Sequence, residues 1–292
     1  MRPVRSLLYV PANRREWVEG ASEGPADGVI VDLEDAVALD GKADAREVVA
    51  DALDGFDDPE VAVTVRVNPP DTGLFEADLQ AVVRPGLDAV VLPKLPSPDV
   101  VRQADHVLGY LESVRDIEDP VEILALPETA EGFRGTYELC TASDRVTALA
   151  AATAKGADVQ RALGFEWTAE GEEKQYMLSK LAMDGRAAGV EQLISGPWLD
   201  IDDHEGLRAE AERARQFGYT GYQVIHPDHV PVVNEVFTPD EEEVRRSREL
   251  VAAVEEADGE GVLRYEGEMV DLAHVRRAEG VIERARAFGL LD

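Results

Sequence analysis

Short apolar runs alternate with amphipathic stretches along most of the chain. Runs rich in branched residues begin at positions 6, 28, 61, 88, 122, 146, 192 and 221. Stretches with helical spacing of apolar residues separate most of them, for example 42–56 and 205–219, and Gly218 is suited to end the second. Strands that are apolar on both faces and alternate with helices are typical of a parallel sheet covered by helices. Eight such units predict an α/β fold, a (β/α)₈ TIM barrel, with a doubly wound open sheet as the alternative.

The pattern changes after residue 227. A charged helix is predicted over 240–257, a glycine-punctuated segment follows over 258–271, and a final helix begins at 272. This tail is too short and polar to form a core of its own. We therefore predict a barrel over residues 1–227 and a C-terminal helical extension over 228–292, which packs on the barrel or on a neighbouring subunit.

Polar residues gather where the predicted strands end. In a (β/α)₈ barrel these ends meet at one mouth, where active sites are built. The residues concerned are Asn13, Arg14, Asp32, Glu34, Asp35, Arg66, Asn68, Lys94, Glu128 and His226.

Two carboxylates follow successive predicted strands, Glu128 in "EILALPET" and Asp158 in "TAKGAD". One or two carboxylates completed by water and substrate oxygens are the ligands that Mg²⁺ prefers. The alternative is that each acid caps the helix that follows it.

Three more acids, Asp32, Glu34 and Asp35, lie within four positions after the second strand. They need a cation or hydrogen-bond donors, since bare anions repel one another. They are suited to orient metal-bound water, to pair with Arg66 or Lys94, or to cap the next helix.

Three basic side chains have both chemical and structural interpretations. Arg66 interrupts an alternating strand, so it either holds a carboxylate and stabilises an enolate oxygen or forms a structural ion pair. His226 precedes a proline, which suits a strand-end turn as well as a base. Lys94 stands where a class I aldolase would place its Schiff-base lysine. Motifs for nucleotide cradles, nucleophile elbows and zinc helices are absent from the sequence.

Composition narrows the class of protein. Sixty acidic against 29 basic residues give a net charge of −31, which argues against nucleic-acid binding. An acid-rich surface with few lysines is typical of proteins from halophiles, and we expect a haloarchaeal origin. The one cysteine, Cys140, fits a reducing compartment. Without a membrane-length apolar run or a signal peptide, the protein is expected to be cytoplasmic and not bound to membranes.

Several motifs together resemble the citrate lyase β-subunit and malyl-CoA lyase family of (β/α)₈ barrels. They include "RSLLYVPANR", "GVIVDLEDAV", "VVLPK", "PETAEG", "GPWLDIDDHEG", "GYQVIHPDHVPVVNEVF" and "GEMVD", and they span nearly the whole chain in order. The resemblance implies a Mg²⁺-dependent lyase, with Mn²⁺ as a substitute. Its substrate would be a 3-hydroxydicarboxylyl-CoA thioester of the malyl-CoA, β-methylmalyl-CoA, citramalyl-CoA or citryl-CoA type, cleaved by retro-Claisen chemistry through a thioester enolate. Partners would be the CoA thioester, glyoxylate or a related oxo acid, and further copies of the chain in a homotrimer or hexamer.

The resemblance also assigns roles to particular positions. It makes Glu128 and Asp158 the metal ligands, and Glu34 and Asp35 the acids that hold metal-bound water. It makes Arg66 the residue that holds the substrate carbonyl and stabilises the enolate. It makes Asp271 the acid that transfers a proton, often from an adjacent subunit. The residues that would contact the substrate or coenzyme A are Tyr9, Arg14, Pro197 and Trp198. By its position alone, Asp271 is predicted to cap the final helix.

Other functions remain open. One is malate synthase-like condensation followed by thioester hydrolysis, another is a citrate lyase subunit with a carrier-bound substrate, and a third is a non-catalytic role. The chain differs from the family pattern at Ala12, Ser195, Tyr222 and around Lys155. These differences bear on the identity of the acyl-CoA more than on the reaction class.

Overall fold

The computed structural model of the chain describes residues 1–56, 59–256 and 262–291. It divides into two compact units, Met1–Asn234 and Glu235–Asp292. The division falls within helix α10 (Val230–Phe237), a few residues after the boundary expected from the sequence. Each unit is described by itself.

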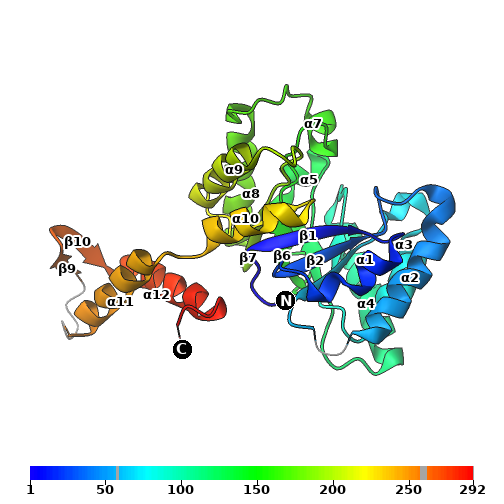
Figure 1. Cartoon of the computed structure of the whole chain (residues 1–292), viewed down its shortest axis with the longest axis horizontal. Coiled ribbons are helices and arrows are strands. Elements are labelled where there is room, and N and C mark those ends of the chain that lie inside the picture. The colour runs from blue at the N-terminus through cyan, green and yellow to red at the C-terminus, as the bar shows by residue number, and fades with distance from the viewer. Residues whose placement is uncertain (57–58, 257–261, 292) are drawn as a thin grey trace. The chain divides into compact units, whose positions relative to one another are not determined.

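The first unit is a closed parallel barrel of eight strands in chain order (Figure 1). Strand β1 pairs with both β2 and β8, which confirms the predicted barrel and excludes the open sheet. The strands are β1 Ser6–Pro11, β2 Gly28–Asp32, β3 Ala62–Arg66, β4 Ala89–Leu92, β5 Glu122–Ala125, β6 Val146–Ala150, β7 Gln192–Ser195 and β8 Gly221–Val224.

The strand sequences explain why the barrel forms. Every residue of β2, β3 and β4 is buried, as continuous branched apolar runs require when helices cover the outer face. Side chains such as Leu7, Ile30, Val91, Leu124 and Ile194 pack together in one apolar core cluster. Burial of this surface is the main term that stabilises the barrel.

Helices follow the strands and lie outside them (Figure 1). They are α1 Arg15–Glu19, α2 Lys42–Gly55, α3 Phe75–Val82, α4 Pro98–Arg115, α5 Ala130–Arg134, α6 Thr136–Cys140, α7 Asp158–Leu163, α8 Gln175–Ala187 and α9 His204–Gln216, with 3₁₀ turns at Ala21–Glu23, Leu39–Gly41, Pro70–Thr72, Glu172–Lys174 and Pro227–His229. Gly218 follows α9 with φ of +94°, the left-handed conformation that ends many helices. Within the described ranges, no helix is both long and apolar enough to cross a membrane.

The second unit contains a hairpin as well as helices. Strands β9 (Val262–Tyr265) and β10 (Glu268–Asp271) pair antiparallel between α11 (Glu241–Glu256) and α12 (Leu272–Ala287). The two helices pack on each other through Val244, Val281 and Ala285. The two predicted C-terminal helices are present, and residues 262–271 of the glycine-punctuated segment between them form a hairpin that the sequence did not predict. Residues 258–261 of the same predicted segment lie outside the described residues.

Candidate active site

A cavity of about 910 Å³ opens at the C-terminal ends of the barrel strands. Its walls combine apolar side chains with a small number of charged ones, as is typical of ligand sites. Polar lining residues include Tyr9, Asp32, Asp35, Arg66, Glu128, Lys155, Asp158 and His226.

Asp32 and Arg66 form a buried ion pair in the wall of this cavity. Each is the last residue of its strand, and the register of β2 and β3 places the two side by side. Arg66 Nε and Nη2 donate to the two carboxylate oxygens of Asp32 at 2.8 and 2.7 Å. Backbone N–H groups of Glu34 and Ala36 also donate to Asp32, at 2.9 and 3.0 Å. The first of the three acids therefore orients the arginine and holds the loop after β2.

Arg66 also contacts groups beyond Asp32. Its Nη1 lies 3.5 Å from Glu34 Oε2, and its guanidinium stacks 5.0 Å from the centre of the Tyr9 ring. Burial raises the pKa of Tyr9 above its ordinary value, so the phenol keeps its proton and donates to Gln223 Oε1 at 2.8 Å. The structural ion pair expected as one interpretation of Arg66 is present, and its guanidinium lines the cavity as well.

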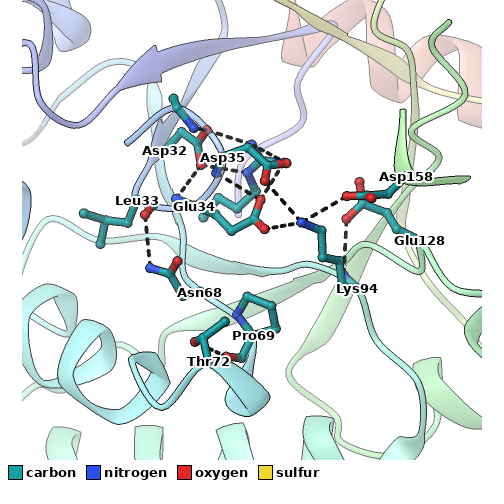
Figure 2. Close-up of polar contacts among 12 residues, drawn as sticks. Asp32, Leu33, Glu34, Asp35, Asn68, Pro69, Thr72, Lys94, Glu128 and Asp158 are labelled. Atoms are coloured by element: carbon teal, nitrogen blue, oxygen red, sulfur yellow. Dashed lines mark hydrogen bonds and ion pairs between the residues drawn. The ribbon is translucent and has the colours of Figure 1, made fainter. Parts of the chain in front are cut away.

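Lys94 joins the remaining acids of the site, as Figure 2 shows. Its ammonium contacts Glu34 and lies 3.2 Å from Asp35 Oδ1 and 3.0 Å from Asp158 Oδ2. The backbone N–H of Lys94 donates to Glu128 Oε2 at 3.2 Å. Residues that follow β2, β4, β5 and β6 in the chain are thus held in one network.

The carboxylates of this network have different affinities for protons. Burial raises the pKa of Glu128 to about 7, although Arg66 and Lys94 oppose the shift. Burial also raises the pKa of Glu34, whereas at Asp158 the effect of burial is outweighed by hydrogen bonds from Lys94 and Arg161, which lower its pKa. At Glu128 the cost of burying the charge exceeds the stabilisation that Arg66 and Lys94 supply, so a bound cation would offset what remains. Glu128 is therefore suited to a cation.

The donor set fits Mg²⁺ better than a metal held by protein alone. Within residues 1–56, 59–256 and 262–291, no group of three or more His, Cys, Asp or Glu side chains is arranged to hold a metal ion. Glu128 and Asp158 both line the cavity and supply carboxylate oxygens there. Mg²⁺ is commonly bound by one or two carboxylates, with water and substrate completing its octahedron.

Comparison with known proteins agrees with this geometry. The sequence profile described as "HpcH/HpaI aldolase/citrate lyase" matches residues 5–227. The chain belongs to this HpcH/HpaI aldolase/citrate lyase family. A second profile, described as a C–C bond lyase of the TIM-barrel fold, matches residues 173–290. By family, the protein is a carbon–carbon lyase.

Three relatives of this family member extend over nearly the full chain. The L-malyl-CoA/β-methylmalyl-CoA lyase of Cereibacter sphaeroides is 31% identical, with 97% of this chain and 95% of that protein covered. The (3S)-malyl-CoA thioesterase of the same species is 34% identical, with 98% and 95% covered. The crystal structure of CitE from Mycobacterium tuberculosis, in complex with magnesium, acetoacetate and coenzyme A, has a TM-score of 0.78 and 30% identity, with 97% and 98% covered.

Of the residues that the family resemblance assigns to substrate or coenzyme A contacts, only some line the cavity. Pro197 lines the cavity, whereas Trp198 is buried against the ring of Trp167, 5.7 Å away between centroids. Arg14 is exposed and does not line the cavity. Its guanidinium lies 5.7 Å from the ring centre of Trp17, and Trp17 does line the cavity.

Asp271 belongs to the second unit. It is the N-cap of α12, where its Oδ1 accepts from the N–H of Ala273 at 2.9 Å and from that of His274. The cap predicted from its position alone is confirmed. His226 similarly accepts from the N–H of Asp228 at 3.3 Å, which is the strand-end turn expected as one interpretation, and its side chain lines the cavity.

The positions that depart from the family pattern lie in or near the barrel. Ala12, Ser195 and Tyr222 are buried. Lys155 lines the cavity, and its ammonium lies 5.9 Å from the ring centre of Trp167. Lys155 thus adds a cation to a wall that is otherwise rich in acids.

Two site residues were missed by the sequence reasoning. Lys42 is buried, and its ammonium donates to the carbonyl oxygens of Leu33 at 2.6 Å and of Glu34, which fixes the loop after β2. Gln223 accepts from Tyr9 inside the barrel. The signals were a lysine in a lysine-poor chain and an amide within an apolar strand.

Proposed function

We propose that the protein is a Mg²⁺-dependent lyase that cleaves a 3-hydroxydicarboxylyl-CoA thioester of the malyl-CoA, β-methylmalyl-CoA, citramalyl-CoA or citryl-CoA type. The products are an oxo acid such as glyoxylate and a shorter acyl-CoA. The observation that carries the proposal is the convergence of Glu128, Asp158 and Arg66 on one cavity at the barrel mouth. The protein is proposed to act as a homotrimer or hexamer.

Glu128 and Asp158 would hold the metal, in keeping with the raised pKa of Glu128 and with the position of both carboxylates on the cavity wall. When bound, Mg²⁺ supplies positive charge that polarises substrate oxygens. Mn²⁺ has similar oxygen preferences and would substitute for it. Glu34 and Asp35 lie beside Lys94, where they are suited to hold water next to the metal ligands.

In the proposed reaction a base takes the proton of the substrate hydroxyl, the adjacent C–C bond breaks, and its electron pair passes to the thioester as an enolate. Arg66, oriented by Asp32, would stabilise the enolate oxygen through a charge-assisted hydrogen bond. Asp271 would give a proton to the enolate carbon and take up another from solvent, while the base releases the hydroxyl proton to solvent, so that no proton is gained or lost overall. Tyr9, Pro197, Trp198 and Arg14 would bind the acyl group and the coenzyme.

The test is to incubate the purified protein and Mg²⁺ separately with each of the four thioesters and to identify products by mass spectrometry. One thioester is expected to be cleaved, and Glu128→Gln is expected to lower kcat/KM by at least about 100-fold. Glu131→Gln is the matched control, because Glu131 is exposed three residues further on. Absence of cleavage by protein that binds Mg²⁺ would refute the proposal.

A thioesterase activity is the second candidate, favoured by the 34% identity to the (3S)-malyl-CoA thioesterase. In one form of this activity, malyl-CoA would yield free malate and coenzyme A, and the C–C bond of the malyl group would stay intact. In the other, acetyl-CoA and glyoxylate would be condensed, and the thioester of the product would then be hydrolysed. Release of free coenzyme A, measured with a thiol reagent, separates these reactions from cleavage alone.

A third candidate is a citrate lyase subunit whose substrate rides on a carrier protein. It is favoured by the citrate lyase members of the family. The expected result would be no cleavage of free CoA thioesters and activity once the acyl group is loaded on a carrier.

A further inference from the structure

The ammonium of Lys94 separates two groups of carboxylates. Glu34 and Asp35, after β2, lie on one side of it, and Asp158 lies on the other with Glu128 close by (Figure 2). Four acids from three parts of the chain therefore share a region in which Lys94 is the central cation, with Arg66 farther from Glu34 and Asp35, at 3.5 and 3.9 Å.

The backbone helps to hold this lysine in place. Lys94 has φ of +52°, a left-handed conformation that is unusual for a residue with a side chain. Its N–H donates to Glu128 while its ammonium contacts the other three acids. An unfavourable backbone conformation of this kind persists only where surrounding contacts enforce it.

The number of protein ligands, together with the size and flexibility of the site, decides which divalent cation the site favours. Ca²⁺ takes six to eight oxygen ligands with flexible geometry, whereas Mg²⁺ keeps several waters and needs only one or two carboxylates. With Glu34 and Asp35 held by Lys94, Glu128 and Asp158 are left to a metal. Without the ammonium, Glu34 and Asp35 would keep only their longer contacts with Arg66, at 3.5 and 3.9 Å, and would be drawn to the cation as further ligands.

We propose that Lys94 is a positioning residue that keeps Glu34 and Asp35 from ligating the metal, and that it thereby makes the site select Mg²⁺ over Ca²⁺. This inference rests on the proposed function, since it takes Glu128 and Asp158 as the ligands. Binding of the metal requires the ammonium to give up Asp158 alone, because its contacts with Glu34 and Asp35 lie on the opposite side (Figure 2).

The test is to measure the Kd values of Mg²⁺ and Ca²⁺ by calorimetry without substrate, for the wild type, Lys94→Met and Arg161→Gln. Arg161 also pairs with Asp158, at 2.7 Å, but from an exposed position. Both variants remove one positive charge beside Asp158 and are expected to tighten binding of both metals. Lys94→Met alone is expected to lower the ratio of the Ca²⁺ Kd to the Mg²⁺ Kd, by about tenfold or more.

A second readout counts the ligands directly. Water-proton relaxation of bound Mn²⁺ reports the waters on the metal, and their number is expected to fall in Lys94→Met and to stay unchanged in Arg161→Gln. If Lys94→Met does not fold, Lys94→Asn serves as the neutral variant, because asparagine tolerates the left-handed backbone. Lys94→Arg keeps the charge and is expected to restore wild-type metal preference.

The outcomes separate this inference from the proposed function. If Lys94→Met or Lys94→Asn keeps the wild-type ratio and water count while Glu128→Gln abolishes metal binding, the role of Lys94 is refuted and the metal site stands. If Glu128→Gln and Asp158→Asn bind Mg²⁺ as the wild type does, the proposed ligands themselves are wrong.

Discussion

Glu128 is a buried acid whose charge destabilises the metal-free fold. Its pKa rises from 4.5 to about 7 on folding, so the folded state holds a proton that the unfolded state has released. The free energy of unfolding therefore falls as pH rises from about 4.5 to about 7, by about 3 kcal/mol from this group. We expect metal-free Glu128→Gln to be more stable than the wild type at pH 8, and the difference to vanish near pH 4, as measured by urea unfolding.

Asp158 provides the control of opposite sign. Its pKa is lowered, because hydrogen bonds from Lys94 and Arg161 outweigh burial, so its charge stabilises the fold at every pH above its ordinary pKa. Asp158→Asn should therefore be less stable than the wild type at pH 8. Equal losses of stability in both variants at that pH would contradict the account of Glu128.

At the scale of elements, Gly196 permits the close approach of β7 to β8 beside the cavity. It has φ of +103°, and an added Cβ would lie 2.7 Å from both the carbonyl oxygen of Gln223 and the ring of Tyr222. Gly196→Ala thus adds steric overlap to backbone strain. We expect it to lower the free energy of unfolding by about 2 kcal/mol more than Gly189→Ala does.

Gly189 is the matched control because its φ is +81° and an added Cβ would meet nothing within 4 Å. Gly189→Ala then measures strain alone. Urea unfolding of the two variants under the same conditions gives the comparison, and equal losses would mean that the space around Gly196 adjusts freely.

The sequence predicted elements better than it predicted contacts. All eight barrel strands lie within the predicted apolar runs, because continuous branched runs between amphipathic helices have few other solutions. The pairing of Asp32 with Arg66 depends on the register of β2 and β3, which no local pattern specifies. The conformation of Lys94 likewise comes from its tertiary contacts.

The hairpin of the second unit shows another limit of local patterns. Its turn, Glu266 and Gly267, has positive φ at both residues, as in a type I′ turn. Such turns are signalled by Asn-Gly or Asp-Gly, whereas here a glutamate takes the first position. The sequence pattern of this segment therefore did not predict a hairpin.

At the scale of the whole molecule, the acid excess predicts stabilisation by salt. A net charge of −31 repels itself, and the Debye length falls from about 10 Å at 0.1 M to about 3 Å at 1 M. We expect the free energy of unfolding in urea to rise between 0.1 and 2 M KCl. A fall would mean that ion pairs such as those of Lys94 outweigh the repulsion, and would oppose a halophilic origin.

The last prediction concerns Asp271, which caps α12 in the second unit and is proposed to protonate the enolate. Asparagine caps helices about as well as aspartate. Asp271→Asn should therefore keep the stability of the wild type while losing turnover, whereas Asp271→Ala should lose both. Thermal unfolding and the thioester cleavage assay give the two readouts.

Mixing distinguishes an Asp271 that acts within its own chain from one supplied by a neighbour. Asp271→Asn and Arg66→Ala are each expected to be inactive alone. If a neighbour supplies Asp271, mixed oligomers contain some sites with an intact Arg66 from one chain and an intact Asp271 from another, and activity returns. If Asp271 serves its own chain, every site in the mixture lacks one of the two groups. Activity regained on co-refolding therefore requires a site shared between subunits, and full activity of Asp271→Asn alone would remove the residue from the mechanism.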